Sequence, residues 1–382
     1  MYRLTSLFML ALGALSSVNA SKNVTDIKHC PALTPRHDGP RSVHDLRMDD
    51  IKVVGALGDS ITAGFGIMGF DTTINPIIAA LNSYNEYRGL SYSIGGDEGA
   101  FTIPNYVKHY QTNVTGYSKG KHIGEYCNAD HLNHVIDVFS IDSPNDDQLN
   151  AAQSGAIAMN LDHELDYLIP QMMLTEGVDF KNDWKMINIQ IGSNDMCGAC
   201  NSSYMDEVTP EKFGGYVEAA IERIHDNIPN VLVNLISTFN VSELFPLTEG
   251  KAYCRPKNND SSTVGNKESC SCGNSEEGLQ KMYNLTAAYN EKLHSIYEKY
   301  QQNKSDTFAV VYQPANLNIS GFPIEFFSNL DCFHPSLMGH QWVSKIVWNM
   351  LFSKQAMKPA VLNFNANETI YCPIDSDRIV TN

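Results

Sequence analysis

The tripeptide Gly58-Asp59-Ser60 places a hydroxyl group directly after an apolar run, residues 53–57. Such a run is typical of a buried parallel strand, and a serine at its end reaches the edge of the sheet, where the next helix begins. Ser60 is therefore the candidate nucleophile. The same pattern also fits a serine that merely N-caps the following helix.

The segment Asp331-Cys332-Phe333-His334-Pro335 contains the residues that a serine nucleophile requires. A serine hydroxyl is activated by a base that takes its proton, and neutral histidine is the usual base near pH 7. An acceptor at the other ring nitrogen holds the histidine in one tautomer. Asp331, three residues before His334, can reach that nitrogen. The alternative is a loop aspartate that caps the next helix beside an exposed histidine.

Attack on a carbonyl also requires donors for the oxyanion that forms, and backbone N–H groups and asparagine amides serve this purpose. Asn194 follows Gly192 at the end of a predicted strand, where its amide can face the reacting carbon. Gly155 can present its N–H with no Cβ in the way. Individually, Asn194 also fits a turn residue, and Gly155 also fits a glycine at a helix contact.

Strands and helices alternate along the sequence. Short apolar runs, each followed by a loop rich in Gly, Ser, Asn or Pro, predict strands over residues 51–57, 185–191, 231–236 and 308–312. Apolar residues at helical spacing predict helices over residues 213–228, 279–300 and 337–352. We therefore expect an α/β fold with a parallel sheet covered on both faces. The candidate residues fall beyond the carboxyl ends of its strands, where ligands bind.

In chain order, these motifs resemble the four blocks of the GDSL, or SGNH, hydrolase superfamily. The blocks are Gly58-Asp59-Ser60, Gly155, Gly192-x-Asn194-Asp195 and Asp331-x-x-His334-Pro335. Within the superfamily, four segments are similar to the animal, membrane-associated phospholipase B group: residues 91–97, 191–200, 331–334 and 371–373. The resemblance implies a three-layer α/β/α, flavodoxin-like fold with a short parallel sheet. It also implies a serine esterase that uses no metal or organic cofactor.

The resemblance assigns a role to each matching position. Ser60 is the nucleophile, His334 the general base and acid, and Asp331 the residue that orients His334. The oxyanion hole consists of the N–H groups of Ser60 and Gly155 and the amide of Asn194. In a structural role, Asp59 and Asp195 fix the turns that aim Ser60 and Asn194.

Two features depart from the phospholipase B group. Its membrane-associated members carry tandem copies of this domain and a C-terminal membrane span, neither of which the sequence contains. Pro335 agrees with the broader superfamily, whereas that group has an aromatic residue at this position. Both departures bear on the substrate more than on the catalytic residues.

The composition is acidic, with 43 Asp and Glu residues against 27 Lys and Arg, and a net charge of −16. This balance argues against nucleic acid as a partner and against broad attraction to anionic membranes. Transient contact with a membrane or micelle surface is compatible with it. Beyond the N-terminal segment, no apolar run approaches the length of a membrane span, so we expect a soluble mature chain. The oligomeric state has no signature in the sequence.

Residues 1–20 have a charged start, an apolar middle and small residues at the end, as in a secretory signal peptide cleaved after Ala20. An uncleaved anchor is the alternative. We expect an extended lead-in over residues 21–49, one esterase domain over residues 50–373 and a tail over residues 374–382. The expected location is extracellular, with diversion to an acidic, lysosome-type organelle as the alternative.

Nine cysteines in a secreted chain predict disulfides, with at least one cysteine outside them. The spacings Cys197-x-x-Cys200 and Cys270-x-Cys272 also fit half of a zinc site, but no second pair stands at zinc-finger spacing. Residues 250–275 predict a disulfide-tied surface loop.

Nine sequons predict a glycosylated surface, at Asn23, Asn113, Asn201, Asn240, Asn259, Asn284, Asn303, Asn318 and Asn367.

Three functions fit the sequence. The first is a secreted serine esterase that releases fatty acyl chains from phospholipids or lysophospholipids through an acyl-enzyme. The second is an esterase for short-chain or acetyl esters, including acetylated glycans. The third is a catalytically silent glycoprotein that binds lipid or a partner. The retained serine, histidine and aspartate argue against the third.

Overall fold

A parallel sheet of four strands forms the centre of the computed structural model, which describes residues 22–124, 127, 143–254 and 266–382. The strands lie side by side in chain order: β2 (Ile51–Gly58), β5 (Trp184–Gln190), β6 (Val231–Ile236) and β7 (Phe308–Gln313). They match the four predicted strands to within one residue at each end. The prediction succeeded because these strands are buried on both faces and therefore read as continuous apolar runs.

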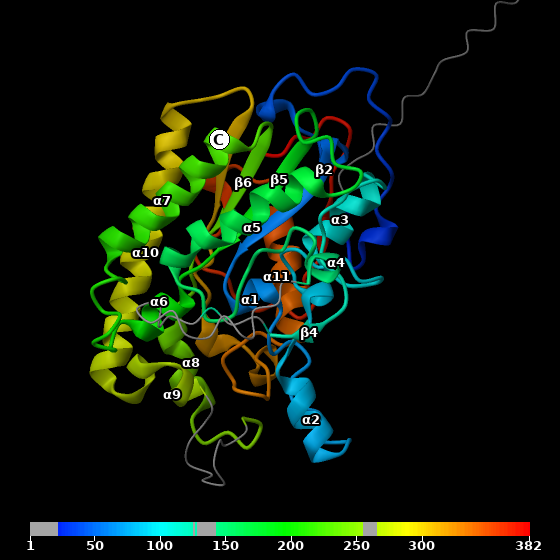
Figure 1. Cartoon of the computed structure of the whole chain (residues 1–382). Coiled ribbons are helices and arrows are strands. Elements are labelled where there is room, and N and C mark those ends of the chain that lie inside the picture. Colours follow the sequence, from blue (N-terminus) through cyan, green and yellow to red (C-terminus); the bar gives the residue numbers. More distant parts are fainter. Residues whose placement is uncertain (1–21, 125–126, 128–142, 255–265) are drawn as a thin grey trace, which may run out of the picture.

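Helices cover the sheet on both faces (Figure 1). On one face, α7 (Pro210–Asn227) packs between α5 (Leu161–Leu174) and α10 (Glu276–Gln302). Behind the sheet, α11 (Leu337–Met350) packs against α3 (Ile103–Tyr110). Right-handed connections between successive parallel strands place α5, α7 and α10 on the same face. The α/β class and the three layers are confirmed.

Shorter elements complete the fold. The remaining helices are α1 (Ser60–Ala63), α2 (Pro76–Ser83), α4 (Pro144–Asp147), α6 (Ser193–Gly198), α8 (Leu244–Thr248) and α9 (Asn266–Ser269). Two small antiparallel pairs consist of β1 (Lys22–Val24) with β8 (Ile370–Cys372), and β3 (Asn85–Glu86) with β4 (His122–Ile123). Single parallel bridges add Thr115 and Asn150 to the outer edge of β2. The second bridge brings the segment that leads to Gly155 beside the strand that leads to Ser60.

The two terminal segments belong to the same hydrophobic core as the sheet. Leu46, Met48 and Ile379 are each at most 1% exposed and lie in that core. The Ile379 N–H donates to the carbonyl of Leu46, and a disulfide joins Cys30 to Cys372. The segments expected as a lead-in over residues 21–49 and as a tail over residues 374–382 thus meet in the folded structure. The many polar residues of both segments conceal the few apolar ones that anchor them.

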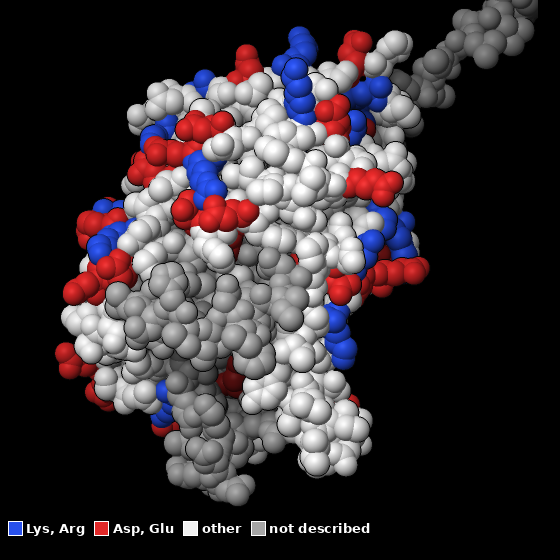
Figure 2. Space-filling model, in the orientation of Figure 1, with Lys and Arg blue, Asp and Glu red and all other residues white. Residues whose placement is uncertain are grey.

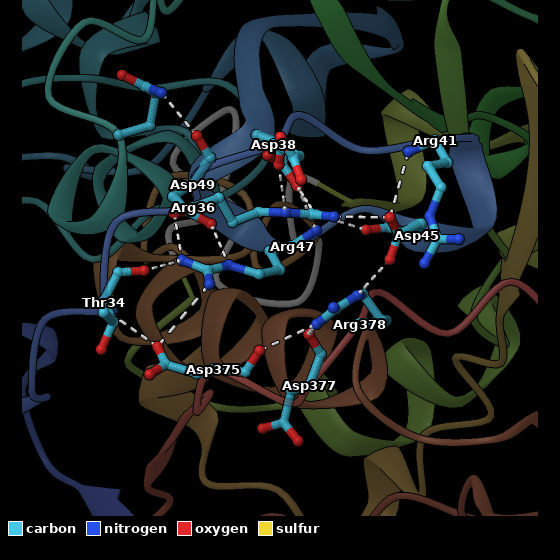
Figure 3. Close-up of polar contacts among 12 residues, drawn as sticks. Thr34, Arg36, Asp38, Arg41, Asp45, Arg47, Asp49, Asp375, Asp377 and Arg378 are labelled. Atoms are coloured by element: carbon cyan, nitrogen blue, oxygen red, sulfur yellow. Dashed lines mark hydrogen bonds and ion pairs between the residues drawn. The ribbon is translucent and has the colours of Figure 1, made fainter.

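Charged side chains reinforce this junction between the two ends of the chain (Figure 3). Asp45 accepts hydrogen bonds from Arg36 Nη2 at 2.6 Å and from Arg378 Nε at 2.8 Å. Burial opposes ionisation of Asp45, but the two arginines outweigh it and lower the pKa of this carboxyl. Arg47 pairs with Asp49 and reaches Asp375 from the other end of the chain.

Eight of the nine cysteines form four disulfides: Cys30–Cys372, Cys197–Cys270, Cys200–Cys272 and Cys254–Cys332. The two closely spaced pairs that also fitted half of a zinc site are thus joined to one another. Cys127 lies outside the disulfides, and burial raises its pKa to about 12. Part of the predicted loop over residues 250–275 lies outside the described residues, namely 255–265.

The structure distinguishes among the nine sequons. Asn240 is only 5% exposed, and its amide donates to Glu243 at 3.0 Å, so this position is not open to a glycan. The burial of Asn240 therefore corrects the prediction of a glycan at this residue. Asn259 lies outside the described residues, as does the predicted signal peptide. The other seven are exposed: Asn23, Asn113, Asn201, Asn284, Asn303, Asn318 and Asn367.

Among the described helices, none is long and apolar enough to cross a membrane.

Candidate active site

Ser60 stands at the sharp turn between β2 and α1. Gly58 makes the turn at φ +152°, where a Cβ would lie 2.3 Å from the Gln190 carbonyl oxygen. Asp59 caps the helix, because its Oδ1 accepts the Ile61 N–H at 2.9 Å. It is fully buried, and burial raises its pKa to about 6. Asp59, not Ser60, is therefore the N-cap, and the serine side chain is available for other contacts.

Ser60, His334 and Asp331 form one chain of hydrogen bonds. Ser60 Oγ lies 2.7 Å from His334 Nε2, and His334 Nδ1 lies 2.5 Å from Asp331 Oδ2. With the ring proton on Nδ1, the histidine donates to the carboxylate and accepts from the hydroxyl. Asp331 Oδ1 also accepts the N–H groups of Phe333 and His334, which fixes the carboxylate. All three residues are buried, with Ser60 5% exposed and Asp331 and His334 each 9% exposed.

The electrostatics of this pair favour a charged histidine beside a charged carboxylate. Burial alone would lower the pKa of His334, but the neighbouring Asp331 outweighs it and raises that pKa above its ordinary value of 6.5. Burial likewise opposes ionisation of Asp331, but His334 and the backbone donors lower the pKa of its carboxyl. The arrangement can therefore take a proton from Ser60 and stabilise the imidazolium that results.

Two aromatic residues and a glycine enclose the His334 ring. Phe65 and Phe333 contact it edge-on, with ring centroids at 4.9 and 5.2 Å. Gly66 has a φ of +75°, and a Cβ there would lie 3.0 Å from His334 Cβ. Close packing on these sides restricts the ring to the orientation that reaches Ser60.

Asn194 and the loop at Gly155 lie together. Asn194 Nδ2 donates to the Ala156 carbonyl at 2.9 Å, which leaves its second amide proton for another acceptor. Gly155 has a φ of +83°, where a side chain would be strained. Within the described residues, the N–H groups of Ser60 and Gly155 donate to no protein acceptor. Three donors on the strand-end loops are thus available to an oxyanion.

Asp195 ties the same loop to α6. Both of its carboxylate oxygens accept the Ala158 N–H, at 3.1 and 3.2 Å. The side chain is buried, and burial raises its pKa to about 7. Its position fits the structural role that was expected of it.

A buried ionic network that no sequence pattern predicted lies beneath the Gly155 loop. Arg88 pairs with Glu86 at 2.8 Å and donates to the carbonyls of Asn150 and Ala152. Glu86 in turn accepts from the Ser154 hydroxyl. These residues lie in segments without helical or strand periodicity, so no pattern marks them as buried. The network fixes the backbone immediately before Gly155.

A second unpredicted residue is Glu164 of α5. Its Oε2 accepts the Gly58 N–H at 2.8 Å, directly beneath the turn that carries Ser60. Burial raises the pKa of this carboxyl well above its usual value. In the sequence, Glu164 is only a glutamate among apolar residues at helical spacing. This pattern is too common to mark a functional residue. Across the described part of the chain, no cluster of three or more His, Cys, Asp or Glu side chains is suited to hold a metal ion.

Comparisons with known proteins show the family to which this chain belongs. The sequence profile of the GDSL-like lipase/acylhydrolase family matches residues 54–347. The membrane-associated phospholipase B1 of Mus musculus is 30% identical over 90% of this chain, and that of Homo sapiens is 30% identical over 91%. The chain therefore belongs to the GDSL-like lipase/acylhydrolase family, a class of carboxylic ester hydrolases.

The chain spans only 22% and 23% of the length of these two relatives. Among solved structures, a phospholipase A1 from Streptomyces albidoflavus is 12% identical, with a TM-score of 0.34. That alignment covers 76% of this chain and 94% of the bacterial enzyme.

Proposed function

We propose that this protein is a serine esterase of the phospholipase B type, which hydrolyses fatty acyl esters of phospholipids or lysophospholipids. The observation that carries the proposal is the hydrogen-bonded chain from Ser60 Oγ through His334 to Asp331. The choice of lipid esters rests on the similarity to phospholipase B1.

In the first half of the reaction, Ser60 Oγ attacks the ester carbonyl while its proton passes to His334 Nε2. Asp331 stabilises the imidazolium, and the N–H groups of Ser60 and Gly155 and the Asn194 amide bind the oxyanion. The intermediate then expels the alcohol, which takes the proton from His334. The acyl group remains on Ser60.

In the second half, water attacks the acyl-enzyme. His334 accepts a proton from the water, and the oxyanion is bound as before. Collapse of the intermediate returns the proton to Ser60 Oγ and releases the carboxylic acid. No cofactor enters either half.

The decisive experiment compares the wild-type protein with Ser60→Ala. We expect the substitution to abolish hydrolysis of phosphatidylcholine and lysophosphatidylcholine and labelling by a fluorophosphonate probe, with the melting temperature unchanged. Ser295→Ala, on the exposed face of α10, is the matched control and should behave as wild type. Retained hydrolysis in Ser60→Ala would refute the nucleophile. Turnover of acetyl esters alone would refute the lipid substrate, and no labelling of wild type would indicate a silent protein.

We also propose that the protein is secreted as a glycoprotein after cleavage of residues 1–20. Four disulfides and seven exposed sequons support this location. N-terminal sequencing of protein from the culture medium should begin at Ser21. Recovery of the mature chain only from an acidic organelle would contradict secretion.

A further inference from the structure

Residues 65–86 extend from the molecule beside the candidate active site, and we call this segment the projection. It starts at Phe65 and returns at Glu86, and an antiparallel bridge between these two residues closes its base. The Tyr87 N–H donates to the Gly64 carbonyl at 2.8 Å and reinforces the closure. In Figure 1, α2 extends from this base away from the sheet and the other helices.

The projection exposes an apolar helix face to solvent. Ile77, Ile78 and Leu81 lie on α2 and are 71%, 53% and 66% exposed, and Ile74, just before the helix cap Asn75, is 37% exposed. We call these four residues the isoleucine face. In a globular protein, an apolar stripe along a helix normally packs against the core. Only two residues of α2 are buried, Ala79 and Ser83. A contiguous exposed apolar face of this kind marks an interaction site.

Charge indicates which partner fits the face. Between Gly64 and Asn85, Asp71 is the only charged residue, whereas the whole chain carries a net charge of −16. Figure 2 shows the surface over α2 almost without coloured side chains. An uncharged apolar face is complementary to a surface of zwitterionic lipid. The negative charge of the rest of the molecule disfavours anionic surfaces.

The base of the projection, rather than the isoleucine face itself, contacts the candidate active site. Phe65, at the base of the projection, contacts the His334 ring. Farther along, the Phe70 N–H donates to Asn329 Oδ1 at 2.7 Å, and Asn329 Nδ2 donates back to the Phe70 carbonyl at 3.1 Å. Asn329 lies two residues before Asp331 in the same loop. A lipid surface bound by the projection would therefore be held beside the loop that carries Asp331 and His334.

The helix is also formed in advance. Asn75 caps it by accepting the Ile77 N–H at 2.9 Å, and Pro76 occupies its first turn. Preformed structure reduces the ordering entropy that binding would otherwise cost.

We propose that the isoleucine face docks on the surface of zwitterionic phospholipid aggregates and presents lipid to Ser60. The purpose of the docking rests on the proposed lipid esterase function, but the docking itself requires no catalysis. Insertion is shallow, as for amphipathic helices that lie in the plane of a membrane interface.

Binding is tested by flotation with phosphatidylcholine vesicles, in a Ser60→Ala background so that the vesicles are not consumed. The double substitution Ile77→Asp with Leu81→Asp should lower the vesicle partition coefficient by about tenfold or more. Met357→Asp, at an apolar residue that is 76% exposed elsewhere, is the matched control and should bind normally. Unchanged binding in the double variant, or no binding by the parent, would overturn the proposal.

Catalysis is then measured with Ser60 restored. The double variant should lose turnover of phosphatidylcholine vesicles by about tenfold or more and keep turnover of a soluble short-chain ester. Equal loss on both substrates would overturn the docking role. If Ser60→Ala retained ester hydrolysis while vesicle binding still depended on the face, the proposed catalytic function would fail and the docking would stand.

A second variant probes insertion directly and does not remove the apolar face. Ile77→Trp should shift its fluorescence to shorter wavelength on addition of phosphatidylcholine vesicles, and less with phosphatidylserine vesicles at low salt. Trp342 and Trp348 are buried, and the spectrum of the parent protein, which also contains the half-buried Trp184, is subtracted as background. Absence of a shift would count against insertion. Sedimentation that shows dimers dissociated by Ile77→Asp with Leu81→Asp would assign the face to a second copy of the chain instead.

Discussion

Ser60 Oγ and His334 Nε2 lie 2.7 Å apart, although 274 positions separate the two residues in the chain. Asp331, by contrast, is only three positions from His334. The histidine and its carboxylate are thus brought together by local structure. The serine reaches them because β2 and the loop before α11 end at the same edge of the fold.

The pH dependence of hydrolysis should follow the raised pKa of His334. The neutral ring that accepts the Ser60 proton exists only above this pKa, which lies above 6.5. For a soluble ester, kcat/KM should therefore fall as the pH drops through that pKa. Asp331→Asn removes the main cause of the raised pKa, so its midpoint should move to lower pH. A wild-type profile that stays flat down to about pH 5 would exclude His334 as the base.

Asp331→Asn should also lower kcat, by roughly 10²- to 10⁴-fold, because the amide no longer holds the ring in the productive tautomer or stabilises the imidazolium. The measurement is turnover of a soluble ester at a pH above both midpoints. Asp146→Asn, on the surface of α4, serves as the control. Near-normal kcat in the Asp331 variant would remove Asp331 from the mechanism.

Asn194→Ala should reduce kcat by roughly 10²- to 10³-fold with little change in KM, because an oxyanion donor acts mainly in the transition state. The hydrogen bond from Asn194 Nδ2 to the Ala156 carbonyl is also lost, so stability is measured in parallel. Asn274→Ala, at an exposed asparagine, is the control. A pure KM effect would assign Asn194 to substrate binding rather than to the oxyanion hole.

Gly66→Ala and Gly99→Ala form a matched pair. Both glycines have positive φ, +75° and +78°, so alanine strains either backbone by about 1–2 kcal/mol. A Cβ at Gly66 meets His334 at 3.0 Å, whereas a Cβ at Gly99 has no atom within 4 Å. We expect similar losses of stability in thermal unfolding, and a fall in kcat only for Gly66→Ala. Equal kcat in the two variants would show that the packing at Gly66 does not position the ring.

The Cys254–Cys332 disulfide should matter to catalysis as well as to stability. Cys332 directly follows Asp331, so the bridge anchors the loop that holds the carboxylate. Its replacement by two serines should destabilise the fold by about 2–5 kcal/mol and also lower kcat. The same replacement at Cys30 and Cys372 should cost comparable stability but leave kcat unchanged in the folded protein. An unaltered kcat without the Cys254–Cys332 bridge would contradict this anchoring role.

Several parts of the fold are readable from the sequence alone because their physical cause is local. Buried parallel strands read as continuous apolar runs, so the four strands were placed correctly. Helix faces follow from periodicity, which located α7, α10 and α11. Asp331 and His334 are close in the chain, so their pairing needed no knowledge of the fold.

Other features depend on which segments meet in space. The pairing of Cys197 with Cys270, and the burial of Arg88 with Glu86, arise from contacts between distant segments that no local pattern encodes. Asn240 and Asn284 carry equivalent sequons, yet only tertiary packing buries the first and exposes the second.

By itself, the sequence determined the candidate nucleophile, its histidine and aspartate, and the alternation of strands and helices, because each depends on residue types at short spacing. Only the tertiary structure decided that Ser60 meets His334, since that contact requires the strand ends to converge. It likewise decided that Ile74, Ile77, Ile78 and Leu81 are exposed, although periodicity alone would assign them to the core. Periodicity reports that a helix has an apolar face, but only the positions of its neighbours determine whether protein covers that face.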